Sequence, residues 1–182
     1  MGRRDAVRLL LPLLDHAAPG VYQGALRGLG TLTETGFRPG EQAAVARELV
    51  TRLRPDLYLV VVAKKVLAGS AEALPGMREL VDRTSSPILR AAALSLLDPH
   101  KATDADTPHD LPLFVRHLDD TDRWVSMAAA AGLAHSVQET GTLPVDEERV
   151  RARLAVLASD PAGPVREAAT EAIRVLEDHR NS

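Results

Sequence analysis

Side chains of the types that ligate metals gather in the stretch between Asp98 and Asp110. Its carboxylates and imidazoles are Asp98, His100, Asp104, Asp106, His109 and Asp110. The spacing Asp104-Ala-Asp106 resembles the opening of a calcium-binding loop, but the glycine at its sixth position and the glutamate at its twelfth are absent. The stretch has no apolar periodicity, so we interpret it as an exposed loop, with a metal ion bound there as the alternative.

Motifs for covalent or nucleotide chemistry are missing from the sequence. There is no cysteine, which excludes disulfides, thiol catalysis and cysteine-ligated metal. No G-x-S-x-G, P-loop or G-x-G-x-x-G occurs. The scattered His16, His117 and His135 fall at the ends of expected helices, where histidine can favour the helix dipole. We therefore expect no enzyme activity, no cofactor and no metal.

Aromatic and arginine side chains form the second set of candidates, because tyrosine, tryptophan and arginine are enriched at protein-binding hot spots. Most lie one residue before or after the start of an apolar helix stripe, at positions that recur along the chain. The candidates for a binding surface are Tyr22, Arg27, Tyr58, Arg90, Trp124 and Arg166. The alternative is structural: the aromatic rings fill gaps between repeats, and Arg90 and Arg166 bond the acidic turn of the next repeat.

The element that must position these residues is best seen in Ser159–Leu176. Asp160 and Pro161 indicate a turn, Pro164 suits a first helical turn, and an apolar stripe begins at Val165. The same pattern recurs along the chain, and we call the first residue of each stripe its lead residue. The lead residues are Val21, Leu59, Leu89, Val125 and Val165. Their spacings of 38, 30, 36 and 40 residues are typical of a helical repeat array.

The repeat register predicts an all-α fold, an α-solenoid (α-α superhelix) of about five helix pairs in a single domain, 1–182. Each pair has an outer helix followed by an inner helix that carries the lead residue. The predicted repeats are approximately 4–36, 40–70, 72–98, 110–137 and 146–178, with a loop at 99–109. Leu57–Ala63 favours a strand locally, but the register requires a helix there. The final helix is expected from Pro164 to about Glu177.

The five segments resemble HEAT repeats of the bacterial HEAT-like and phycobilisome-lyase type. The resemblance rests on the openings Leu89-Arg90 and Val165-Arg166 and on the pairs Ala92-Ala93, Ala128-Ala129 and Ala168-Ala169. Armadillo and tetratricopeptide arrays fit the sequence less well. The resemblance implies a non-catalytic scaffold or adaptor that binds a protein partner on the concave face of its inner helices.

Specialised proteins of similar fold supply the alternatives. The first is a nucleic-acid-binding or DNA-repair module that resembles HEAT-like alkylpurine glycosylases, for which Arg27, Lys64, Lys65 and Arg90 would form a basic stripe. Those enzymes use a groove with several aromatic residues, and only 3% of this chain is aromatic. Deoxyhypusine hydroxylases hold iron with His-Glu pairs, and no such dipeptide occurs here. Bilin lyases leave no motif that can be placed in the sequence.

Charge and hydropathy bound the partners and the compartment. The net charge is −3, which argues against a general affinity for nucleic acid. Residues 1–95 carry 13 Lys and Arg against 9 Asp and Glu, whereas residues 96–182 carry 9 against 16. This asymmetry is interpreted as drift among solvated residues, with a polar binding surface or end-to-end self-association, including assembly into a larger array, as the alternative. No apolar run is long enough to span a membrane, and we expect a cytoplasmic protein.

Overall fold

The computed structural model describes residues 3–34, 41–54, 63, 66–67, 73–97 and 110–180. Throughout these ranges the regular elements are helices and there is no strand, which confirms the predicted all-α class. The contacts divide the chain into two compact units, Met1–Leu80 and Val81–Ser182. The single domain that the register predicts, 1–182, remains a prediction.

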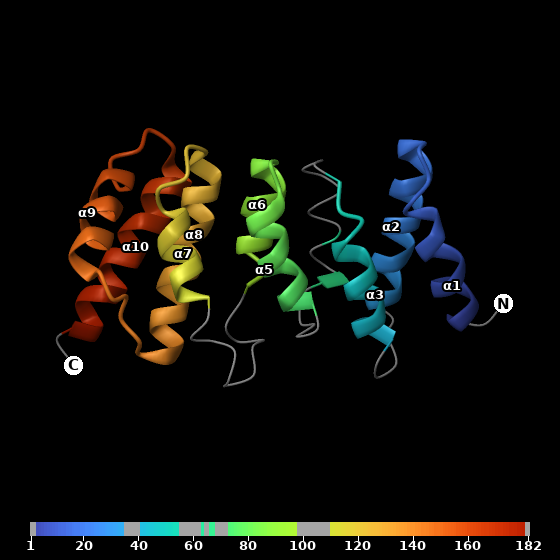
Figure 1. Ribbon diagram of the computed structural model, residues 1–182, viewed down its shortest axis with the longest axis horizontal. Helices are drawn as coiled ribbons and strands as arrows, with labels where there is room; N and C mark the ends of the chain where they lie inside the picture. The colour runs from blue at the N-terminus through green and yellow to red at the C-terminus, as the bar shows by residue number, and fades with distance from the viewer. Residues whose placement is uncertain are drawn as a thin grey trace. The chain divides into compact units, whose positions relative to one another are not determined.

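Unit 1, residues 1–80, contains helices α1 (Arg3–Leu13), α2 (Pro19–Glu34) and α3 (Glu41–Val50), coloured blue to cyan in Figure 1. The boundary between the units falls within α5 (Leu74–Arg83). Helix α1 packs against both α2 and α3. A Cβ placed on Gly28 of α2 would lie 2.9 Å from Leu10 Cδ1, so the two helices of the first pair approach closely where a side chain is missing.

The second inner helix lies mostly outside the described residues. Its described members Ala63, Val66 and Leu67 are helical and buried, as the register predicts, whereas Tyr58, Lys64 and Lys65 fall outside. In the outer helix of the same repeat, α3 buries Val45, Ala46, Leu49 and Val50.

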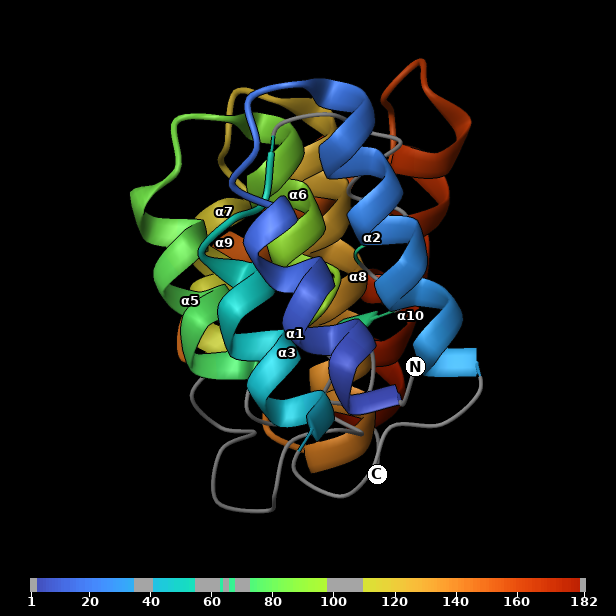
Figure 2. The ribbon, with the colours of Figure 1, turned by 90° about the vertical axis from the view of Figure 1, so that its right-hand side faces the viewer.

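Unit 2, residues 81–182, contains α6 (Pro87–Leu94), α7 (Leu111–His117), α8 (Arg123–Thr140), α9 (Glu147–Leu157) and α10 (Gly163–Arg180). Helix α8 packs against α6 and α10, α7 packs against α8, and α9 packs against α10. The helices α6, α8 and α10 therefore form an inner layer, and α7 and α9 form an outer layer (Figure 2). This alternation of stacked pairs is the α-solenoid that the sequence predicts.

Small side chains in the inner layer allow the close packing. Ala129 and Ala169 are buried at matching positions of α8 and α10, and Ala128 and Ala172 are buried close to them in the same helices. A Cβ built on Gly132 of α8 would lie only 2.3 Å from the ring of Phe114 in α7, so this glycine makes room for the aromatic side chain. The apolar stripe of the sequence thus becomes the contact surface between neighbouring helices.

Helix ends follow the expected capping chemistry. Asp122 caps α8 by accepting from the N–H groups of Trp124 and Val125, and Gly141 ends α8 in the left-handed conformation with φ 66°. Helix α10 extends to Arg180, beyond the end near Glu177 that the stripe predicts. Basic side chains in its last turn favour the extension, because they complement the negative end of the helix dipole.

Candidate functional site

A hydrogen bond recurs in the turns that precede α2, α6, α8 and α10. Five residues before the lead residue, a side chain accepts from the backbone N–H two residues further on. The pairs are Thr84 with Ser86 at 3.1 Å, Asp120 with Asp122 at 2.9 Å, Asp160 with Ala162 at 2.8 Å and, in unit 1, His16 with Ala18 at 3.1 Å. Threonine, aspartate and histidine side chains therefore make the same hydrogen bond to the backbone, and this bond fixes the conformation of the turn before the inner helix.

The residue directly after the lead residue completes this turn in unit 2. Arg90 donates to the Thr84 carbonyl at 2.6 Å, Ser126 to the Asp120 carbonyl at 3.0 Å, and Arg166 to the Asp160 carbonyl at 2.8 Å. In each case the acceptor lies six residues earlier. Arg90 and Arg166 thus each bond the turn before their own helix; for Arg166 this is not the turn of the next repeat that the structural alternative expects.

Arg90 also reaches the next repeat. Its Nη1 donates to Asp120 Oδ2 at 2.8 Å, as the structural alternative anticipates, and His117 Nδ1 lies 3.6 Å from the same oxygen. Burial alone would raise the pKa of Asp120, but hydrogen bonds from the Asp122 N–H and Arg90 hold it below its ordinary value. Burial lowers the pKa of His117, and the nearby Arg116 lowers it further. This cluster ties consecutive repeats together.

In unit 1 the candidates Tyr22 and Arg27 lie in different surroundings. Tyr22 is fully buried, its hydroxyl donates to the Arg52 carbonyl at 3.1 Å, and the Arg54 guanidinium stands 4.2 Å above its ring. Arg27 is exposed on α2, six residues after the lead residue Val21. Tyr22 therefore belongs to the core, and Arg27 to the surface of the inner helix.

Trp124 is an aromatic candidate with an exposed side chain. Its side chain is 47% exposed at the start of α8, one residue before the lead residue. A stripe of exposed and half-buried residues continues from it at helical spacing through Met127, Ala131, His135 and Gln138. This stripe alternates with the buried residues of α8, among them Val125, Ala129 and Leu133.

Equivalent positions on α6 and α10 extend the stripe across the layer, because repeats of one geometry present equivalent residues on the same side. What we call the inner face of unit 2 consists of three positions in each inner helix: the residue before the lead residue, the second residue after it and the sixth residue after it. Its members are Ile88, Ala91 and Ser95, then Trp124, Met127 and Ala131, then Pro164, Glu167 and Glu171. All nine are exposed or half-buried. Of these nine residues only Trp124 was a candidate from the sequence. The repeat register places the other eight at equivalent positions and could have indicated them.

The α10 end of the inner face is acidic. Glu167 is exposed and forms no ion pair with any described residue, whereas Glu171 accepts from Arg174 at 2.6 and 2.9 Å. Arg174 also bonds Asp178 at 2.5 Å, and its hydrogen bonds lower the pKa of Glu171. Arg174 is thus shared between two carboxylates, and Glu167 adds a third that has no ion-pair partner among the described residues, so carboxylates outnumber guanidinium groups in this cluster.

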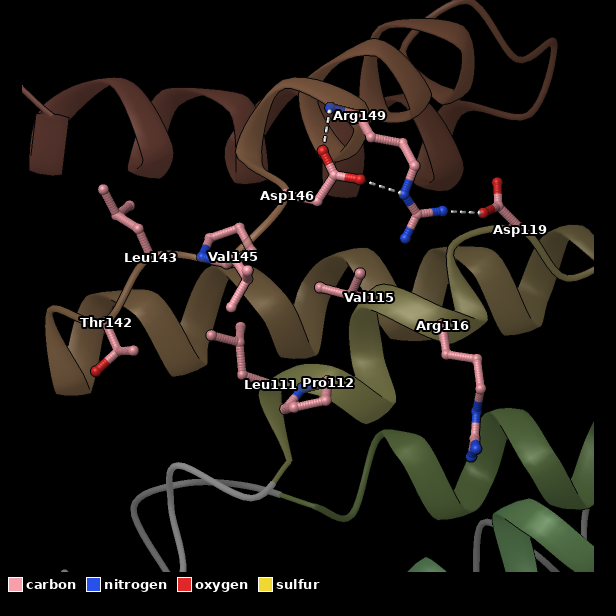
Figure 3. A pocket seen from close by; sticks show the side chains of 11 residues that line it. Leu111, Pro112, Val115, Arg116, Asp119, Thr142, Leu143, Val145, Asp146 and Arg149 are labelled. Carbon is pink, nitrogen blue, oxygen red and sulfur yellow. Dashed lines mark hydrogen bonds and ion pairs between the residues drawn. The ribbon is translucent and has the colours of Figure 1, made fainter.

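A pocket on the outer side of unit 2 is the second feature to consider (Figure 3). Its cavity of about 500 Å³ lies between α7 and the segment that leads into α9. Apolar side chains, among them Leu111, Val115 and Val145, line it, and Arg149 spans one side by bonding Asp146 and Asp119 at 3.1 and 3.0 Å. Arg149 is paired with Asp146 and Asp119, and Arg116 with Asp82 outside the pocket, so each charged group of the lining already has an ion-pair partner.

The described ranges contain no group of three or more histidine, aspartate or glutamate side chains that could hold a metal ion. Of the ligand-type loop only Asp110 is described, and it is buried at the start of α7; the rest, 98–109, lies outside. Among the described helices, none combines the length and hydropathy that a membrane span requires.

Comparisons with known proteins add little to this description. No protein-family model matches the chain, and no curated protein matches it. Among solved structures it is similar to the designed armadillo repeat protein YIII(Dq)4CqI, with 17% identity and a TM-score of 0.49, over 92% of this chain and 80% of that one. The stacking of helix pairs within unit 2 therefore carries the assignment as a helical repeat protein, and membership of the HEAT family remains a prediction.

Proposed function

We propose that this chain is a non-catalytic scaffold or adaptor that binds a protein partner through the inner helices, and that Trp124 is central to the contact. The observation that carries the proposal is the 47% exposure of this tryptophan on the inner layer. Tryptophan has the large rigid surface that anchors interfaces, and exposing half of it to water forgoes hydrophobic burial.

Neighbouring residues support the proposal. Ile88 is 39% exposed at the equivalent position of α6, and the half-buried Met127 lies one turn after Trp124 on α8. Methionine adapts its shape to a partner surface at little cost. A contiguous apolar patch bordered by polar residues is typical of a protein-binding site. Arg90 and Arg166 contribute to this surface by holding the turns that orient the inner helices.

The test is an affinity pull-down from the lysate of the native host with the wild-type chain and Trp124→Ala. The matched control is Val156→Ala, which removes an exposed apolar side chain, 61% exposed, from α9 in the outer layer. Circular dichroism first establishes that both variants fold. We expect one protein that wild type and Val156→Ala recover and that Trp124→Ala loses.

Other outcomes would contradict the proposal. Equal recovery by all three chains would remove the inner face as the binding surface. If the wild-type chain instead recovered nucleic acid that stayed bound through salt washes, the alternative of a nucleic-acid-binding or DNA-repair module would be favoured. Turnover of a small molecule by the purified chain would contradict the non-catalytic assignment.

A further inference from the structure

We propose that the inner face of unit 2 selects a partner segment in which an aliphatic or aromatic side chain is followed by lysine or arginine residues. This inference rests on the proposed function and specifies the chemistry of its partner. It is carried by the uneven distribution of apolar and charged groups on the nine residues that define the face.

The part of the face on α6 and α8 carries no charge, and five of its six residues are apolar, the exception being Ser95. Ile88 and Trp124 are its large exposed side chains, and Ala91, Met127 and Ala131 fill the space between them without charge. Stacked helices lie about 8–10 Å apart, so these residues form one surface that a few partner side chains can cover. Burial of such a surface favours apolar partner groups at roughly 25 cal/mol per Å².

The part of the face on α10 is negative. Glu167 and Glu171 hold the positions that Met127 and Ala131 hold on α8, so carboxylates stand beside the apolar patch. Glu167 has no ion-pair partner among the described residues, and Arg174 is shared between Glu171 and Asp178. A cationic partner group would find an uncompensated carboxylate here.

The arginines nearest this face do not neutralise it. Arg166 donates to the carbonyls of Asp160 and Pro161, both at 2.8 Å. Arg123 Nη1 lies 3.8 Å from Asp160 Oδ1. Both guanidinium groups are thus directed to the turn before α10, and the charge that a partner meets on the face is negative. Electrostatic complementarity then favours a basic segment over an acidic one.

Trp124 provides the readout, because it is the only tryptophan of the chain. The experiment titrates the full chain with a synthetic peptide in which leucines precede a run of lysines, and follows the indole fluorescence. Two matched peptides carry glutamates in place of the lysines, or serines in place of the leucines. We expect a saturable change with the leucine–lysine peptide and weaker binding of both matched peptides.

Variants of the chain test the role of the carboxylate. Glu167→Lys reverses the charge on the face and is expected to weaken binding of the leucine–lysine peptide by about tenfold at low salt, with the difference shrinking as salt screens it. Glu148→Lys makes the same change on the exposed surface of α9 and should leave binding unaltered. Thermal unfolding of both variants checks that they are folded.

The possible failures separate this inference from the proposed function. Preference for the leucine–glutamate peptide, or equal binding by Glu167→Lys, would overturn the basic-partner chemistry and leave the apolar binding face. If the pull-down recovered a partner that depends on Trp124 but no peptide changed the fluorescence, only the basic-partner chemistry would be overturned. If the pull-down recovered no such partner and no peptide bound, both proposals would be overturned together.

Discussion

Arg90 and Asp120 join two consecutive repeats of unit 2 through a bond of 2.8 Å between Nη1 and Oδ2. Arg90 extends from the inner helix α6, and Asp120 lies in the turn before the next inner helix, α8. The same arginine bonds the Thr84 carbonyl, and the same aspartate accepts from the Asp122 N–H. The pair therefore couples the turns of neighbouring repeats, and helix stacking depends on it.

Replacement of Arg90 by methionine should destabilise the chain. Asp120 is only 9% exposed and would lose its charged partner, and the Thr84 carbonyl would lose a donor. Loss of a hydrogen bond to a charged group of this kind costs about 1.5–3 kcal/mol. Urea unfolding measures the change. Arg174→Met, which removes an arginine from an exposed cluster on α10, is the control and should have a much smaller effect. Equal losses in both variants would contradict a special role for Arg90.

Replacement of Gly132 by alanine should destabilise unit 2, because its Cβ would lie 2.3 Å from the Phe114 ring. Such overpacking costs about 1–3 kcal/mol. The control is Gly24→Ala in α2, where no atom lies within 4 Å of the new Cβ. That change should stabilise the chain by about 0.5–1 kcal/mol, since alanine favours helix over glycine. Denaturant midpoints compare the two, and addition of Phe114→Leu should recover part of the loss in Gly132→Ala.

Removal of the cap of α8 by Asp122→Ala should cost about 0.5–2 kcal/mol. The variant loses the carboxylate that accepts from the Trp124 and Val125 N–H groups at 2.9 and 3.2 Å. Asp122→Asn keeps an acceptor oxygen at this position and should retain most of the stability. Thermal unfolding distinguishes them, and an asparagine variant as unstable as the alanine variant would show that charge, rather than capping geometry, is what matters.

Stability should fall as the solution is acidified below the ordinary pKa of histidine, because of His117. Its pKa is lowered in the folded chain, so the unfolded chain binds a proton more readily over this range. The contribution of His117 to the free energy of unfolding is complete above its pKa in the unfolded chain. It is lost as the pH falls through its pKa in the folded chain. The pKa of Asp120 is also lowered, and its contribution is lost in a separate window at more acidic pH.

Chemical denaturation at successive pH values, with wild type and His117→Asn, checks this prediction. The variant should have a flatter dependence of the free energy of unfolding in the histidine range. A slope that is unchanged in His117→Asn would show that another group is responsible.

Much of the architecture was determined by the sequence itself. The spacing of the lead residues Val125 and Val165 and the alanine pairs beside them placed the inner helices, because helical periodicity and close packing are local properties of the pattern. The side-chain caps of α8 and α9, at Asp122 and Asp146, are interactions of the same local kind.

Only the tertiary structure decided what the side chains near the lead residues do. Tyr22 and Trp124 are both aromatic and adjacent to a lead residue, yet one is fully buried and the other is 47% exposed. Arg90 and Arg166 are arginines in one column, but Arg90 also reaches across to the next repeat. Exposure and partner choice depend on which neighbouring helix and turn come within reach, and that is set by packing between repeats, which no single segment of sequence contains.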